Sequence, residues 1–283
     1  MRSTLLLILA LAAGCAEHSS TEVRKEASLD DLVGRANPPA AKVDPKVATK
    51  AGAAAHAPSG PAPLEALTRL SAGNARFANE QRRRSADTTD DAEERAATAK
   101  GQHPFAAVLT CADSRVPPEL LFDQSIGDLF VVRNAGNVAE PIGEGSLEYA
   151  VEHLGVRLIV VLGHASCGAV KAISGTEGPL PGHLADIQRA MPGLRDFALE
   201  RGKAGATPDG VIAAAVERNA SSQAAALLAG SAVLRQAVAD GSIAVVPGVY
   251  DLSSGVVGFL LPSQAAKTTT PDLPGEAPAH SGH

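Results

Sequence analysis

Residues 105–115 read FAAVLTCADSR, a short apolar run that ends in a cysteine, an aspartate and an arginine. Three more apolar runs of this kind occur along the chain, at residues 129–132, 158–162 and 243–246. Helical patterns separate them, near residues 117–122, 145–154 and 209–238. A continuous apolar run is typical of a strand buried on both faces, and strands that alternate with helices indicate parallel crossovers. We therefore expect an α/β fold with a mainly parallel β-sheet flanked by helices.

The composition narrows the class of protein. The 283 residues are 45% hydrophobic and 20% charged, with a formal net charge of -6. These proportions exclude collagen-like, coiled-coil and wholly disordered proteins, and the acidic balance argues against a nucleic-acid partner. With six Phe, two Tyr and no Trp, the core must be built from Ala, Val, Leu and Ile, which suits buried parallel strands.

One folded domain is expected at residues 64–261, and about 200 residues are enough for a sizeable core. It should begin with an N-terminal helical arm, because Leu64, Leu67, Leu70 and Phe77 recur at helical spacing. Residues 256–260 are a candidate for an antiparallel edge strand.

Residues 1–14 have the pattern of an export signal, with a positive start at Arg2, an apolar stretch and small residues before Cys15. The stretch is too short to span a bilayer as a helix, which takes about 20 residues. The run from Leu11 to Cys15 resembles a bacterial lipobox, in which the cysteine is lipidated and becomes the first mature residue. We expect an exported protein that is held on the periplasmic side by a lipid anchor at Cys15. The alternative is ordinary cleavage near Gly14, with an incidental cysteine.

Two segments lack sustained hydrophobic periodicity. Residues 15–63 are polar and then rich in Ala and Pro, which predicts a flexible tether, and residues 262–283 are expected to form a disordered tail. In lipoproteins of this kind an aspartate after the cysteine often retains the protein in the inner membrane. Ala16 therefore favours the outer membrane.

Two cysteines and a histidine follow the predicted strands. Cys111 comes directly after the strand near residue 109, and His164 and Cys167 come after the strand at residues 158–162. Open α/β sheets place their ligand crevices at the carboxyl ends of parallel strands, and a spacing of three residues lets His164 and Cys167 reach one metal from a turn. Two thiolates and one imidazole that converge on a point are a zinc signature.

Other interpretations of the cysteines stay open at this point. In an exported protein, Cys111 and Cys167 could form a disulfide, although a disulfide needs neither His164 nor the neighbouring Asp113 and Arg115. A structural zinc site should show four strong Cys or His ligands, and only three are well placed here. That difference favours an open, catalytic site.

The motifs CADSR at residues 111–115 and HASC at residues 164–167 resemble the paired Cys-x-Asp-x-Arg and His-x-x-Cys signatures of the β-class carbonic anhydrases. The similarity extends through residues 122–124, 127–137 and 146–151, and covers roughly residues 64–261. The resemblance implies a zinc ion bound by Cys111, His164 and Cys167. The fourth ligand would be water, hydroxide or Asp113.

The resemblance also implies the reaction, a reversible hydration of carbon dioxide to bicarbonate and a proton through zinc-bound hydroxide. Asp113 would accept a hydrogen bond from the hydroxide and orient it, while Arg115 pairs with Asp113 and keeps it off the metal. Five further residues are expected to form the substrate pocket: Gln102, Phe130, Ala135, Tyr149 and Gly168.

The family implies an obligate homodimer with active clefts at the subunit interface, and pairs of dimers that form tetramers. The helical arm is expected to extend over the partner. Two alternative functions remain: hydrolysis of carbon disulfide or carbonyl sulfide at the same metal site, and a non-catalytic zinc-binding lipoprotein. Asp113, Arg115 and Gln102 argue against the second, because a binding protein needs no oriented hydroxide.

Three minor features carry less weight. His103 and His153 are candidates for a proton shuttle, but an ordinary surface or cap histidine is the simpler interpretation. Residues 219–221 match a glycosylation sequon. We discount it, because it lies in a predicted helix of a chain with bacterial-type export.

Overall fold

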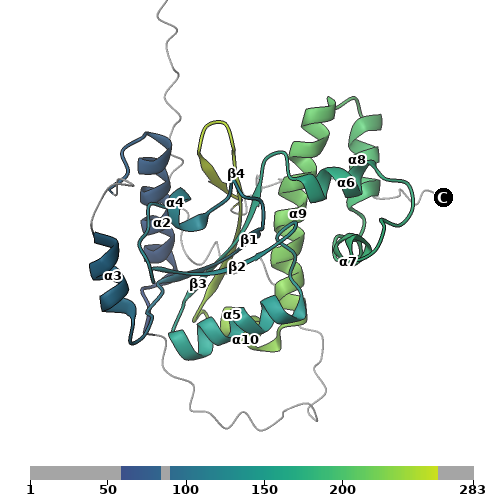
Figure 1. Ribbon diagram of the computed structural model, residues 1–283. Helices are drawn as coiled ribbons and strands as arrows, with labels where there is room; N and C mark the ends of the chain where they lie inside the picture. Colours follow the sequence, from purple (N-terminus) through teal and green to yellow (C-terminus); the bar gives the residue numbers. More distant parts are fainter. Residues whose placement is uncertain (1–58, 84–89, 261–283) are drawn as a thin grey trace, which may run out of the picture.

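The computed structural model describes residues 59–83 and 90–260, which form a five-stranded sheet with helices on both faces (Figure 1). The strands are β1 (Ala106–Cys111), β2 (Leu129–Asn134), β3 (Leu158–His164), β4 (Ala244–Tyr250) and β5 (Val257–Phe259). Their order is β2-β1-β3-β4-β5. Strands β1 to β4 run parallel, and β5 pairs antiparallel with β4. The predicted mainly parallel α/β fold and its antiparallel edge strand are confirmed.

The helices of the described residues are α2 (Pro63–Ala78), α3 (Asp90–Thr98), α4 (Pro118–Leu121), α5 (Pro141–Leu154), α6 (Gly168–Gly175), α7 (Leu184–Arg189), α8 (Leu194–Lys203), α9 (Pro208–Gly230) and α10 (Ala232–Ala239). Proline opens α2, α5 and α9, at a position where the missing N–H has no partner in the helix anyway. The helix predicted at residues 209–238 is divided at Ser231, whose hydroxyl accepts a hydrogen bond from the Leu234 N–H at 3.0 Å and caps α10.

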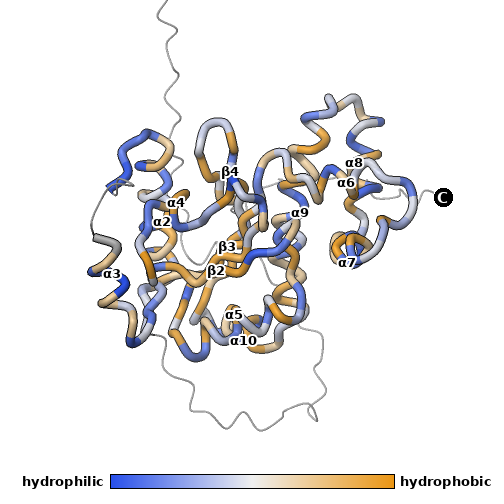
Figure 2. The backbone as a smooth tube through the Cα atoms, in the orientation of Figure 1, coloured by the Kyte–Doolittle hydropathy of each residue, from blue (hydrophilic) through white to orange (hydrophobic). Residues whose placement is uncertain are grey.

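The side chains of β1 alternate between two cores. Ala106 and Val108 pack with residues of α2 and α4, whereas Ala107 and Leu109 pack with residues of α5, α9 and α10. Successive residues of a strand point to opposite faces, so a sheet covered on both sides needs a continuous apolar run. Figure 2 shows this concentration of apolar residues in the strands.

Helix α2 packs against the sheet of its own chain. Ala66, Leu67 and Leu70 lie in the same core as β1. Gly73 lets the helix approach the end of α4, because a Cβ atom at this position would overlap the carbonyl oxygen of Phe122. The predicted helical arm is thus docked on its own domain, and its extension over a partner subunit stays a prediction.

Asn74, the residue after this glycine, joins three parts of the chain. Its Nδ2 donates to the carbonyl oxygens of Leu121 at 3.1 Å and Gly255 at 2.9 Å, and its Oδ1 accepts from the Val257 N–H at 2.8 Å. The side chain is 4% exposed. These three hydrogen bonds attach α2 both to α4 and to the β4–β5 turn.

A third core lies at the carboxyl ends of β1 and β3. It contains Cys111 and Cys167 together with apolar residues of α6, α8 and α9. Figure 1 shows α6, α7 and α8 grouped beside the upper part of α9. No helical pattern was predicted for α6 to α8.

Several predicted segments lie outside the described residues. These are the export signal at residues 1–14, most of the tether at residues 15–63, including Cys15, and the tail at residues 262–283. Their boundaries stay predictions. Within residues 59–83 and 90–260, none of the helices has the length and apolar character that a bilayer crossing requires.

Candidate metal centre

Three buried ligand atoms meet at the carboxyl edge of the sheet. Cys111 is the last residue of β1, His164 is the last residue of β3, and Cys167 directly precedes α6. Their ligand atoms lie within 4.8 Å of one another, and their side chains are at most 5% exposed. The structure therefore brings together the three residues predicted to bind zinc.

Strand pairing and a tight turn produce this arrangement. Strands β1 and β3 pair with Thr110 opposite Leu162, and neighbouring strands lie about 4.8 Å apart. After His164 the chain turns through Ser166, which has a left-handed φ of 55°. The Ala165 N–H, in the same turn, donates to the Tyr250 carbonyl at 2.8 Å and ties the turn to β4. Cys167 is thereby returned toward the strand ends.

The two cysteines are both free, so the disulfide interpretation is wrong. Their hydrogen bond holds the pKa of the Cys111 thiol well below its usual value and raises the pKa of the Cys167 thiol. A metal ion that binds both sulfurs as thiolates must displace any proton they carry, so metal affinity should rise with pH.

His164 has the tautomer that a metal ligand needs. Its Nδ1 lies 2.9 Å from the Ala165 carbonyl oxygen; since a carbonyl only accepts, Nδ1 carries the proton. The buried Nε2 has no hydrogen-bond partner among the described residues, which leaves its lone pair available to a metal. A second nitrogen fixed by a carbonyl is the usual support of a metal-binding histidine, so this donor set fits zinc.

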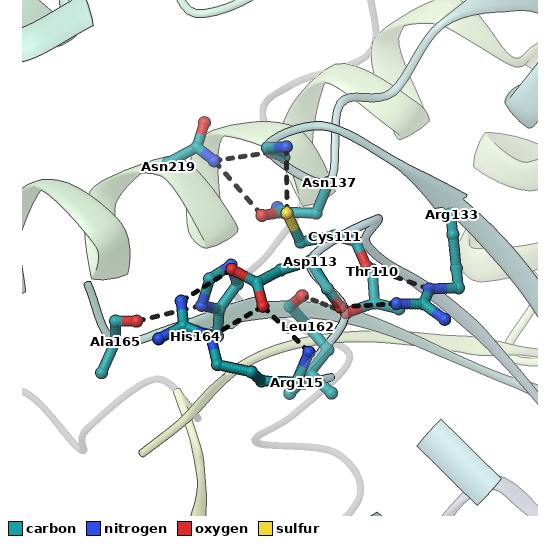
Figure 3. Close-up of polar contacts among 11 residues, drawn as sticks. Thr110, Cys111, Asp113, Arg115, Arg133, Asn137, Leu162, His164, Ala165 and Asn219 are labelled. Carbon is teal, nitrogen blue, oxygen red and sulfur yellow. Dashed lines mark hydrogen bonds and ion pairs between the residues drawn. The ribbon is translucent and has the colours of Figure 1, made fainter. Parts of the chain in front are cut away.

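Asp113 lies between Arg115 and His164 (Figure 3). The Arg115 Nε donates to Oδ1 at 2.9 Å, and Nη2 donates to Oδ2 at 2.7 Å. This bidentate pairing holds the pKa of the Asp113 carboxyl well below its usual range. Oδ2 is also 3.8 Å from His164 Nε2. The structure thus places an ionised acceptor at the edge of the ligand group.

Two of the predicted pocket residues border this group. Ala135 follows β2 in the loop that passes Cys111, and Gly168 comes directly after Cys167. Both are exposed, and a Cβ atom at Gly168 would meet no other atom within 4 Å. Their positions are compatible with the small open pocket predicted for them.

The other three pocket residues lie away from the ligand group of their own chain. Phe130 pairs with Ala107, four residues before Cys111, which is about 13 Å along the sheet. Tyr149 on α5 is 48% exposed, and its ring centroid is 6.4 Å from that of Phe130. Gln102 is exposed and precedes the amino end of β1. A pocket role for these three would need a second chain, and it stays a prediction.

Sequence reasoning missed four polar residues that hold the site: Arg133, Asn134, Asn219 and Gln223. Arg133 donates from Nε to the Cys111 carbonyl at 3.1 Å and from Nη2 to the Asp113 carbonyl at 2.6 Å. Asn134 closes the loop after β2 by hydrogen bonds to both backbone groups of Val138. The sequence did contain a sign of these roles. Arg133 and Asn134 are polar residues at the end of an otherwise apolar strand, and Asn219 and Gln223 are two amides four residues apart in an alanine-rich helix.

Comparisons with known proteins agree with this geometry. A family model described as carbonic anhydrase matches residues 106–257. Carbonic anhydrase 2 of Mycobacterium tuberculosis is 40% identical over 201 residues, which is 68% of this chain and 90% of that protein.

Solved structures resemble the fold as well. The Coccomyxa β-carbonic anhydrase, in complex with acetazolamide, is 30% identical with a TM-score of 0.54, and the match covers 69% of this chain and 86% of that one. A structure from a study of two tetrameric β-carbonic anhydrases of Sordaria macrospora is 25% identical with a TM-score of 0.54, covering 60% of this chain and 90% of that one.

The matched region contains both ligand motifs and all four parallel strands. Its identity to the mycobacterial enzyme extends over most of that protein. The chain therefore belongs to the β-class carbonic anhydrases, a family of zinc enzymes.

Proposed function

We propose that this chain catalyses the reversible hydration of carbon dioxide to bicarbonate and a proton, with zinc held by Cys111, His164 and Cys167. The observation that carries the proposal is the meeting of three ligand atoms within 4.8 Å beside a carboxylate held by an arginine. Zinc at such a site would lower the pKa of a bound water to about 7, which would supply a nucleophile at neutral pH.

Asp113 orients the nucleophile in this proposal. Its Oδ2 is near enough to the ligand group to accept a hydrogen bond from an attacking hydroxide, which turns a lone pair toward the substrate carbon. Arg115 occupies both carboxylate oxygens and so keeps Asp113 from becoming a fourth ligand. An Asp113 released from Arg115 could replace water and close the site. The ion pair therefore selects between the two roles of one carboxylate.

Stopped-flow hydration of carbon dioxide by the full-length protein tests the proposal, with zinc measured in the same samples. Activity should increase in proportion to zinc content. Zinc-loaded protein that does not hydrate carbon dioxide would contradict the assignment. Sulfide release from carbon disulfide, measured on the same samples, separates this activity from the alternative hydrolase.

We further propose that the active form is a homodimer or a tetramer made of two dimers. The placement of Gln102, Phe130 and Tyr149 supports this, because they lie far from the ligand group of their own chain. Strand β2 is also a sheet edge, and the Sordaria relatives are described as tetrameric. Light scattering tests the assembly.

A complementation experiment tests whether Gln102 serves the partner subunit. Mixing Gln102→Ala subunits with Cys167→Ser subunits should then restore part of the lost activity. No recovery in verified mixed dimers would contradict that role.

The lipid anchor forms a separate part of the proposal. It rests on the sequence of residues 1–14 and on Cys15, and it places the enzyme on the periplasmic side, at the outer membrane. Labelling with a tritiated fatty acid in a bacterial host tests it. Label should appear on the wild type and disappear from Cys15→Ser, and the variant should leave the membrane fraction. Equal membrane retention of unlabelled variant and wild type would contradict the anchor.

A further inference from the structure

Helix α9 buries two amide side chains against the loop that follows β2. Asn219 is 2% exposed and Gln223 is 1% exposed. They are four residues apart, which places them on the same face of the helix. A buried amide destabilises the fold unless its donors and acceptor are satisfied. The hydrogen-bond partners of these two side chains therefore show which parts of the chain they fix in place.

Gln223 holds the far end of the loop. Its Oε1 accepts from the Ala139 N–H at 2.9 Å, and its Nε2 donates to the Ala190 carbonyl at 2.8 Å and to Asn219 Oδ1 at 3.2 Å. The Ala139 N–H can only donate, and the Ala190 carbonyl can only accept. The orientation of the amide is therefore determined by its surroundings.

Asn219 holds the near end of the loop. Its Nδ2 donates to the Gly136 carbonyl at 2.9 Å and contacts Asn137 Oδ1 at 3.4 Å. With its own Oδ1 accepting from Gln223, both ends of the Asn219 amide are engaged. The two side chains form a continuous chain of hydrogen bonds from Ala190 to Gly136.

The loop ends on a zinc ligand. The Gly136 N–H donates to the sulfur of Cys111 at 3.3 Å, and Figure 3 shows Asn219, Asn137 and Cys111 grouped at this point. The backbone turns here through left-handed φ values of 80° at Gly136 and 49° at Asn137. Glycine and asparagine adopt this conformation more readily than other residues, and the hydrogen bond from Asn219 on α9 to the Gly136 carbonyl fixes where the turn lies.

We propose that Asn219 and Gln223 are positioning residues for Cys111, which hold residues 136–139 so that the Gly136 N–H donates to the ligand sulfur. A hydrogen bond to a thiolate restricts where the sulfur lies and draws charge from it. The second effect matters where two thiolates bind one metal, because each donates charge to it. This inference rests on the proposed zinc ligation by Cys111.

The zinc dissociation constant and the cobalt(II) spectrum test the inference. The first is measured on full-length protein by competition with a chromogenic chelator. The second reports the geometry of the sulfur ligands through the thiolate-to-cobalt absorption band. Asn219→Ala should weaken zinc binding about 10- to 100-fold, as is typical when support of a ligand is lost, and should shift the band. Gln223→Met retains the side-chain volume and should act in the same direction, which provides a second variant if Asn219→Ala does not fold.

Asn74→Ala is the matched control. Asn74 is also a buried amide with three hydrogen bonds, but it joins α2 to the β4–β5 turn and contacts no ligand. Its loss should lower thermal stability and leave zinc affinity and the cobalt spectrum unchanged. If Asn219→Ala or Gln223→Met behaves in the same way as Asn74→Ala, the two residues are structural only and the inference fails. A wild type without zinc affinity would instead refute the ligand assignment itself.

Discussion

Gly73→Ala should destabilise the protein, although the same change favours most helices. Gly73 lies inside α2, where alanine is favoured over glycine by about 1 kcal/mol. In this structure, however, a Cβ atom would overlap the Phe122 carbonyl oxygen and come within 2.8 Å of Gln124 Nε2. The nearest atom is backbone, so a change of side-chain rotamer cannot relieve the overlap. The helix itself must move.

The size of the effect follows from what that movement disrupts. Overpacking of this kind costs about 1 to 3 kcal/mol. Asn74, the next residue, would also lose the geometry of its three hydrogen bonds, each of which contributes about 0.5 to 1.5 kcal/mol. After the gain in helix propensity, the net loss in free energy of unfolding should be about 2 to 6 kcal/mol.

Urea unfolding of zinc-loaded full-length protein measures this loss, at one protein concentration because assembly and ligand binding shift the midpoint. Gly145→Ala in α5 is the matched control. A Cβ atom there meets nothing within 4 Å, so this variant should gain up to about 1 kcal/mol. A Gly73→Ala protein as stable as the wild type, or more stable, would refute the close approach of α2 to α4.

Three further changes should have distinct outcomes. Cys167→Ser removes one of two thiolates, so zinc measured by atomic absorption should be lost and the melting temperature should fall; stoichiometric zinc in the variant would contradict the ligand assignment. Asp113→Asn leaves the three ligands in place, so zinc should be retained while the turnover number falls by at least about 100-fold; full activity would remove the orienting role. Asp251 accepts hydrogen bonds from Ser253 and Ser254, which hold its pKa at about 2. The stability from these bonds is fully present above the ordinary carboxyl pKa of about 3.9 and is lost as the pH falls through the folded-state pKa of about 2. The melting temperatures of Asp251→Ala and wild type should therefore differ at pH 7 and converge below pH 2.

The sheet and the metal ligands were predictable for one shared reason. Continuous apolar runs indicate strands buried on both faces, and a parallel sheet brings the ends of such runs to one edge. Cys111 and His164 end two of these runs, so their meeting follows from the topology without any knowledge of loop geometry. The position of Cys167 was predictable as well, because a turn can bring a residue three positions after His164 to the same metal.

The support of the site was not predictable in the same way. Asn219 and Gln223 stand in α9, where eight of the 23 residues are alanine, so the apolar pattern does not show which face is buried. Their partners in the loop after β2 are more than 75 residues away along the chain. A polar residue that faces inward reveals its role only through those partners. The sequon at Asn219, discounted because it lies in a predicted helix of a chain with bacterial-type export, contains an amide that the structure buries.

The geometry of the metal ligands depends on the register of the sheet. Cys111 and His164 lie on adjacent strands, aligned by the pairing of Thr110 with Leu162. A slip of one residue between β1 and β3 would move Cys111 by about 3.3 Å and turn its side chain to the other face, which would separate ligand atoms that now lie within 4.8 Å. The slip would equally exchange the residues of β1 between the two cores, including the fully buried Leu109. The free energy that keeps each apolar side chain in its own core therefore also keeps the ligands in place, so residues that never touch the metal contribute to its affinity.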